Sequence, residues 1–105
     1  LLKVPAGAAE AWRKKYNAIQ VNHMVVVKDS LSKSRPDAVR EIYRLLEQSK
    51  KAAKLPRPGE LDVNPFGLEA NRRNLEVVID TVYRQGMIPR RFSVDELFDD
   101  VTRKL

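Results

Sequence analysis

Cysteine is absent from this 105-residue sequence, and histidine occurs once, at His23. Without cysteine, the chain cannot form a disulfide, a thiol nucleophile, an iron–sulfur cluster or a cysteine-based zinc site. A single histidine also excludes a multi-histidine metal centre and a Ser-His-Asp triad with a second histidine to spare. Any metal would depend on carboxylates, and we expect neither a metal ion nor another cofactor.

Long hydrophobic runs are also missing, since the longest extends only from Met24 to Val27. A membrane-spanning helix needs about 20 consecutive apolar residues, so we expect no membrane association. The length suits a single domain or a fragment of one over 1–105, with a modest core. The sequence begins with Leu1 and shows no signal-peptide hydrophobic region, so we expect a piece of a longer protein.

The net charge of +6 is concentrated in the first third of the chain. Arg13 to Lys15 lie beside Trp12 and Tyr16, a pattern that could bind nucleic acid through phosphate contacts and base stacking. The alternative is a solvated helical turn whose aromatic rings pack inward. We favour this alternative, because nucleic-acid-binding domains usually carry more basic residues on one face. Nucleic acid is therefore not an expected partner.

The rest of the sequence shows helical periodicity interrupted by turn residues. Pro36 suits the first turn of a helix, and apolar residues follow from Val39 at i, i+3, i+4 and i+7. The same spacing recurs around Leu75, and Ser93 with Glu96 forms a capping-box pattern before a last apolar stripe. The expected elements are a short helix over 6–16, a strand over 18–28, a helix over 36–53, a loop over 55–67, a helix over 68–85 and a helix over 94–103.

The expected strand creates a structural problem. Apolar residues alternate from Ile19 to Val27 on one face, and Met24 and Val26 occupy the other. The isolated chain is thus expected to be mostly α-helical with one β-strand. One strand cannot satisfy its own backbone donors and acceptors. Either it pairs with a copy in another chain, giving a homo-oligomer, or it belongs to a sheet whose other strands are missing.

Two blocks of sequence carry a family resemblance. Residues 19–31 read IQVNHMVVVKDSL, and Arg35 and Pro36 follow. The second block reads PFGLEANR over 65–72 and QGMIPRRFSVDELF over 85–98. In order and spacing, these blocks resemble the 4,5-dihydroxyphthalate decarboxylase family, and the resemblance extends from about Ala9 to the C-terminus.

The resemblance implies the C-terminal portion of an α/β fold of the type II periplasmic-binding-protein kind, in which a crossing strand returns to the first lobe. It also implies a carboxy-lyase that converts a dihydroxylated aromatic dicarboxylate to 3,4-dihydroxybenzoate in phthalate breakdown. The small-molecule partner would then be an aromatic carboxylate and the location cytoplasmic. We expect the fragment alone to be inactive, so its status as an enzyme belongs to the longer protein.

Two other functions stay open. A solute-binding protein of the same fold would hold a ligand without transforming it, and a periplasmic location would suit it. A weaker alternative is a small basic helical domain that contacts nucleic acid through Arg13 to Lys15.

Four side chains are candidates for the site. His23 titrates nearest neutrality and could supply a proton, although a lone histidine on an apolar face is more often structural. Asn22 could contact substrate or form a hinge hydrogen bond. Asn71 and Arg72 open the second long helix and could receive a carboxylate, or they could be a solvated helix face that braces the preceding turn.

Overall fold

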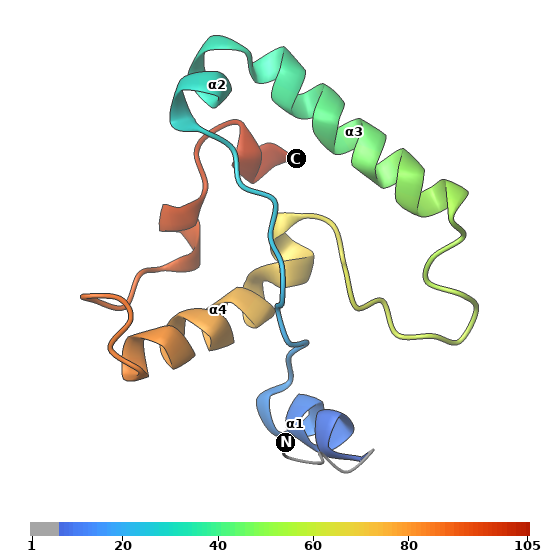
Figure 1. Ribbon diagram of the computed structural model, residues 1–105, viewed down its shortest axis with the longest axis vertical. Helices are drawn as coiled ribbons and strands as arrows, with labels where there is room; N and C mark the ends of the chain where they lie inside the picture. The colour runs from blue at the N-terminus through green and yellow to red at the C-terminus, as the bar shows by residue number, and fades with distance from the viewer. Residues whose placement is uncertain (1–6) are drawn as a thin grey trace.

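The computed structural model describes residues 7–105 and is mostly helical (Figure 1). Its elements, in chain order, are the α-helices α1 (Ala8–Tyr16), α2 (Asp29–Ser34), α3 (Pro36–Ala52) and α4 (Leu68–Arg84), followed by the 3-10 helices η1 (Val94–Leu97) and η2 (Thr102–Lys104). The helices expected over 36–53 and 68–85 are confirmed to within one residue. The helix expected over 6–16 is present from Ala8, and residue 6 lies outside the described residues.

A small core forms where α4 meets the C-terminal segment. Leu75 and Ile79, on one face of α4, are almost fully buried, and Val94 of η1 packs with them. Ile88, Phe92 and Phe98 cover this cluster from its edges. The capping-box prediction is confirmed, because the Glu96 carboxylate accepts from the Ser93 amide at 2.7 Å, which fixes the start of η1.

The helix expected over 94–103 is wrong, since two short 3-10 helices occupy this stretch. The reason is the side chain of Asp99. Its Oδ1 accepts from the backbone amides of Val101 at 3.1 Å and Thr102 at 2.8 Å, and from the Thr102 hydroxyl at 2.7 Å. An aspartate that binds nearby amides competes with helical hydrogen bonding. It therefore ends one turn and begins another.

The strand expected over 18–28 is also not observed. This segment runs between α1 and α2 as an extended chain (Figure 1), and residues 7–105 contain no β-strand. A strand exists only by pairing, and no second extended segment lies beside this one within the described chain. Helix α2 follows directly at Asp29 and was not expected from the sequence.

The loop expected over 55–67 is confirmed as an irregular connection that is tied back to α3. The Lys50 ammonium donates to the Asp62 carboxylate at 2.6 and 2.8 Å and to the Asn64 carbonyl at 2.7 Å. The ring of Phe66 lies against Tyr43 in an edge-on arrangement with centroids 5.3 Å apart. These contacts lead the chain back to the start of α4.

The elements are loosely packed against one another. Its radius of gyration is 15.9 Å, whereas about 13 Å is usual for this length. Its accessible surface is 8469 Å², whereas a folded monomer of 12.0 kDa exposes about 6,000 Å². The excess of roughly 2,500 Å² is surface that a self-contained domain of this size would bury.

Candidate functional site

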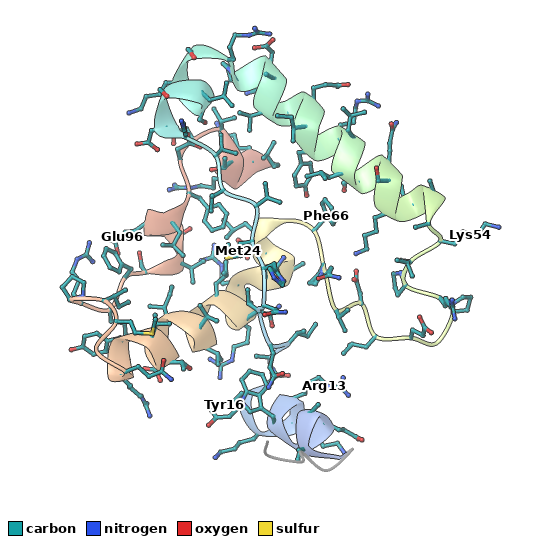
Figure 2. The ribbon with its side chains drawn as sticks, viewed as in Figure 1. Arg13, Tyr16, Met24, Lys54, Phe66 and Glu96 are labelled. Atoms are coloured by element: carbon teal, nitrogen blue, oxygen red, sulfur yellow. The ribbon has the colours of Figure 1, made fainter. Side chains whose placement is uncertain are left out.

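A cleft of about 840 Å³ lies between the extended segment, α3, the first turns of α4 and the C-terminal residues. Met24 of the extended segment and Phe66 of the loop before α4 both line it (Figure 2). Ile42 and Leu46 of α3 form an apolar wall of the cleft, and both side chains are partly exposed. The cleft is large enough for a small aromatic ligand.

Three of the four predicted site residues line this cleft, namely Asn22, His23 and Asn71. Asn22 and His23 are exposed on the extended segment. The structural alternative for His23, a buried histidine on an apolar face, is therefore not what this chain shows. The imidazole lines the cleft from an unpaired segment, and nothing in residues 7–105 holds it in one orientation by a hydrogen bond.

Asn71 has a structural task in this chain. Its side-chain amide donates to the carbonyls of Pro65 at 2.7 Å and Gly67 at 3.0 Å, which closes the turn that leads into α4. Gly67 has a φ of +91°, a backbone region that disfavours other residues. The predicted alternative, in which the polar residues brace this turn, therefore describes the contacts of Asn71.

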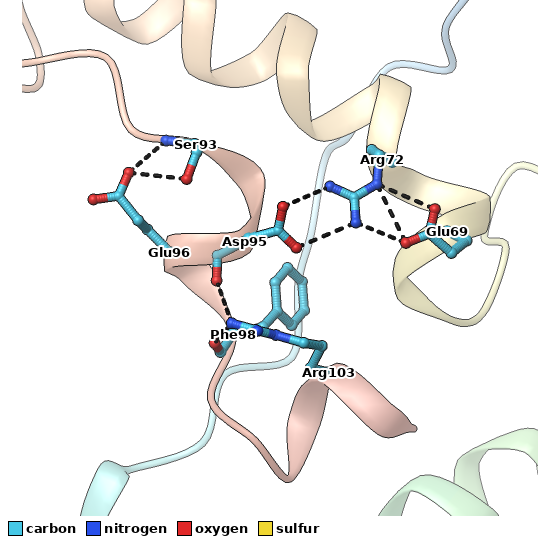
Figure 3. Close-up of polar contacts among 7 residues, drawn as sticks. All are labelled: Glu69, Arg72, Ser93, Asp95, Glu96, Phe98 and Arg103. Carbon is cyan, nitrogen blue, oxygen red and sulfur yellow. Dashed lines mark hydrogen bonds and ion pairs between the residues drawn. The ribbon is translucent and has the colours of Figure 1, made fainter.

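Arg72 does not line the cleft. Its guanidinium donates to Glu69 at 2.7 Å and to Asp95 at 2.9 Å, so that it links α4 to η1 (Figure 3). Hydrogen bonds to Glu69 and then to Asp95 raise the pKa of Arg72, and the same contacts lower the pKa of each carboxylate. In this structure the guanidinium N–H groups that could hold a substrate carboxylate already donate to Glu69 and Asp95.

The arginine pair that follows α4 is engaged as well. Arg90 pairs with Glu96 at 2.6 Å, and its guanidinium lies 4.0 Å from the centroid of the Phe92 ring. Arg91 pairs with Asp80 of α4. Hydrogen bonds from Arg90 and from the Ser93 amide lower the pKa of Glu96 to about 2.

Asn74 was not among the predicted site residues, yet it anchors the candidate site. It is 6% exposed, and its Oδ1 accepts from the Ile19 amide at 2.7 Å, which attaches the extended segment to α4. Its Nδ2 donates to Asn71 at 3.3 Å. The available signal was a polar residue on the apolar stripe of α4, one position before Leu75.

A second anchor joins α2 to the C-terminal segment. The buried Ser32 hydroxyl donates to the carboxylate of Asp99, which in turn binds the first amides of the last turn. Hydrogen bonds from Ser32 first, and then from Thr102, hold the pKa of Asp99 far below its usual range. Because α2 was not expected, no sequence pattern indicated that these two residues would pair.

The basic cluster in α1 packs on its own helix. The rings of Trp12 and Tyr16 lie 4.9 Å apart, and the Lys15 ammonium lies 5.2 Å from the Tyr16 ring. Lys14 pairs with Glu10 at 2.9 Å. The two aromatic rings therefore lie against one another on α1 at an interplanar angle of 42°, and both are half-buried.

From residue 7 onward, no three histidine, aspartate or glutamate side chains lie close enough together to hold a metal ion. In that same part of the chain, none of the helices combines the length and the apolar character needed to cross a bilayer.

The chemistry of the cleft follows from what lines it. Its described walls contain an imidazole, four asparagine amides and many apolar side chains, but no lysine or arginine. Asp29 and Asp99 contribute carboxylates to the same walls. An aromatic dicarboxylate would meet an apolar surface and like charges without a cation to hold it.

Comparison of the chain with family models, curated proteins and solved structures found no match.

Proposed function

We propose that this chain is the C-terminal part of a 4,5-dihydroxyphthalate decarboxylase-like protein and is inactive by itself. The resemblance over residues 19–31, 65–72 and 85–98 supplies the reaction class. The proposed inactivity of the isolated chain rests on the cleft. Its lining includes His23 as a candidate proton donor, but the described walls hold no cation for a substrate carboxylate. The remaining site residues would come from the rest of the protein.

In the proposed reaction, a proton passes from the His23 imidazolium to the ring carbon that bears the leaving carboxylate. The bond from that carbon to the carboxylate then breaks, carbon dioxide leaves, and the electron pair returns to the ring as it regains aromaticity. The barrier falls if the acid lies within hydrogen-bonding reach of that carbon. Asn22, which lines the same cleft, would donate a hydrogen bond from its side-chain amide to a ring hydroxyl or carboxylate.

Asn71 and Arg72 take supporting parts in this proposal. Because Asn71 closes the turn before α4 and Arg72 links α4 to η1, they would position the cleft walls without touching substrate. The location proposed for the longer protein is the cytoplasm, where a degradative enzyme would meet its substrate. A secretory signal peptide on the longer protein would favour the solute-binding alternative and a periplasmic location instead.

The test compares the longer protein with the 105-residue chain. Carbon dioxide and 3,4-dihydroxybenzoate are measured after addition of 4,5-dihydroxyphthalate, with unhydroxylated phthalate as the substrate control. The longer protein is expected to release both products, and the isolated chain to release neither above background. Product release by the isolated chain contradicts its inactivity, and binding without turnover by the longer protein favours the solute-binding alternative.

A variant pair assigns the proton donor. His23→Asn in the longer protein is expected to lower kcat by about a hundredfold or more, the usual contribution of a general acid. Lys54→Gln is the matched control, because Lys54 is exposed in the connection after α3 and does not line the cleft. Equal activity of the two variants would remove His23 from the reaction.

A further inference from the structure

The extended segment carries three strongly exposed apolar side chains in a row. Met24 is 50% exposed, Val25 is 71% exposed and Val26 is 86% exposed. Three consecutive apolar residues this open to water are unusual in a folded chain, and β-branched residues of this kind suit a strand. The segment therefore has strand-forming side chains but, within the described residues, no strand beside it.

One backbone contact shows which edge of the segment is free. The Ile19 amide points to α4, where it donates to Asn74 at 2.7 Å. In an extended chain, successive amides point to opposite sides. Regular alternation from Ile19 onward predicts that the amides of even-numbered residues from Gln20 to Val26 face away from α4. This edge has a row of donors and acceptors that a second extended chain could pair with.

The sequence of the segment is suited to pairing with itself. In an antiparallel pair centred on His23, Ile19 faces Val27 of the copy and Val21 faces Val25. On this face, shifting the centre by one residue sets His23 against Val21 or Val25, whereas the other face of the centred register pairs Gln20 with Val26 and Asn22 with Met24. The free-edge amides then belong to the hydrogen-bonded pairs, and the two His23 side chains meet at the two-fold axis in a non-hydrogen-bonded pair.

We propose that the isolated chain forms a two-fold dimer by antiparallel pairing of residues 19–27 through the edge that faces away from α4. The surface available is sufficient. The excess of roughly 2,500 Å² per chain is larger than the roughly 800 Å² that each partner buries in a standard interface. The exposed Ile42 and Leu46 of α3, across the cleft from this segment, would contribute apolar area. A second copy is also the one partner of matching chemistry that is always present.

A pair of proline variants tests the edge. Val26→Pro removes an amide that donates across the interface, whereas Val25→Pro removes one that faces the α4 side. The dissociation constant is measured by sedimentation velocity at physiological salt, where charge repulsion between two chains of net charge +6 is screened. We expect Val26→Pro to weaken the dimer at least about tenfold, since one hydrogen bond is lost from each copy, and Val25→Pro to weaken it much less.

A second pair tests the register without changing the backbone. His23→Lys places like charges opposite each other at the two-fold axis, whereas Gln20→Lys places a charge opposite Val26 of the copy. The first is expected to dissociate the dimer more than the second. A chain that is monomeric at every concentration, or equal weakening within both variant pairs, overturns the proposal. These outcomes are independent of carbon dioxide release by the longer protein, so the two proposals fail separately.

Discussion

Replacing Asn74 with alanine tests how the extended segment is held. The Asn74 side chain is 6% exposed and accepts from the Ile19 amide at 2.7 Å. Its removal leaves that amide without a partner, which costs about 1–3 kcal/mol. Alanine is the better helix former by roughly 0.5 kcal/mol, which offsets part of the loss. The expected net loss is about 1–2 kcal/mol in the free energy of unfolding.

The assay is urea unfolding followed by far-UV circular dichroism. With an m-value of about 1–1.5 kcal/mol per molar for so small a chain, the midpoint should fall by roughly 1 M. Thr81→Ala is the matched control, because the Thr81 hydroxyl donates only within α4, to the Val77 carbonyl at 2.7 Å. The control should change stability by less than about 0.5 kcal/mol. If both variants unfold at the same midpoint, Asn74 is not the anchor described above.

Three further changes should each give a distinct result. Glu96 has an unfolded pKa near 4.5 and a folded pKa near 2, so its stabilisation is complete above about pH 4.5 and lost as pH falls through 2. Urea midpoints measured across that range should fall less steeply in Glu96→Gln, and equal slopes would contradict this. Gly67→Ala, at a φ of +91°, should lower the thermal midpoint, whereas Gly7→Ala, at a φ of −81°, should not. Lys50→Met should speed proteolysis within the loop over 55–67, because it removes contacts to Asp62 and Asn64, and unchanged cleavage would show that other contacts hold the loop.

The two long helices could be predicted because local rules and packing agree. Pro36 begins α3, and the apolar spacing around Leu75 gives α4 its buried face. The capping box at Ser93 was also readable, because both partners lie within one turn of each other. These features depend on residues close together in the sequence.

The parts that sequence reasoning missed depend on distant contacts. Helix α2 is only six residues long, and its buried Ser32 is held by Asp99, 67 residues further along the chain. That same carboxylate also divides the expected C-terminal helix. The extended segment over 18–28 has the composition of a strand, but strand formation depends on a partner that residues 7–105 do not supply.

The candidate site was only partly predictable for the same reason. Periodicity could place His23 and Asn22 on an extended segment and Asn71 at the start of a helix, and the structure brings all three to one cleft. Periodicity could not show that Asn71 and Arg72 form hydrogen bonds with other residues, because turns bring Pro65, Gly67 and Asp95 to them.

Backbone hydrogen exchange, measured residue by residue over 19–27, shows whether this segment pairs as a strand. At concentrations where the chain is dimeric, we expect slow exchange at Gln20, Asn22, Met24 and Val26 and fast exchange at the odd-numbered positions from Val21 to Val27. Fast exchange at every position from 20 to 27, in a dimer or at any concentration, would contradict this pairing.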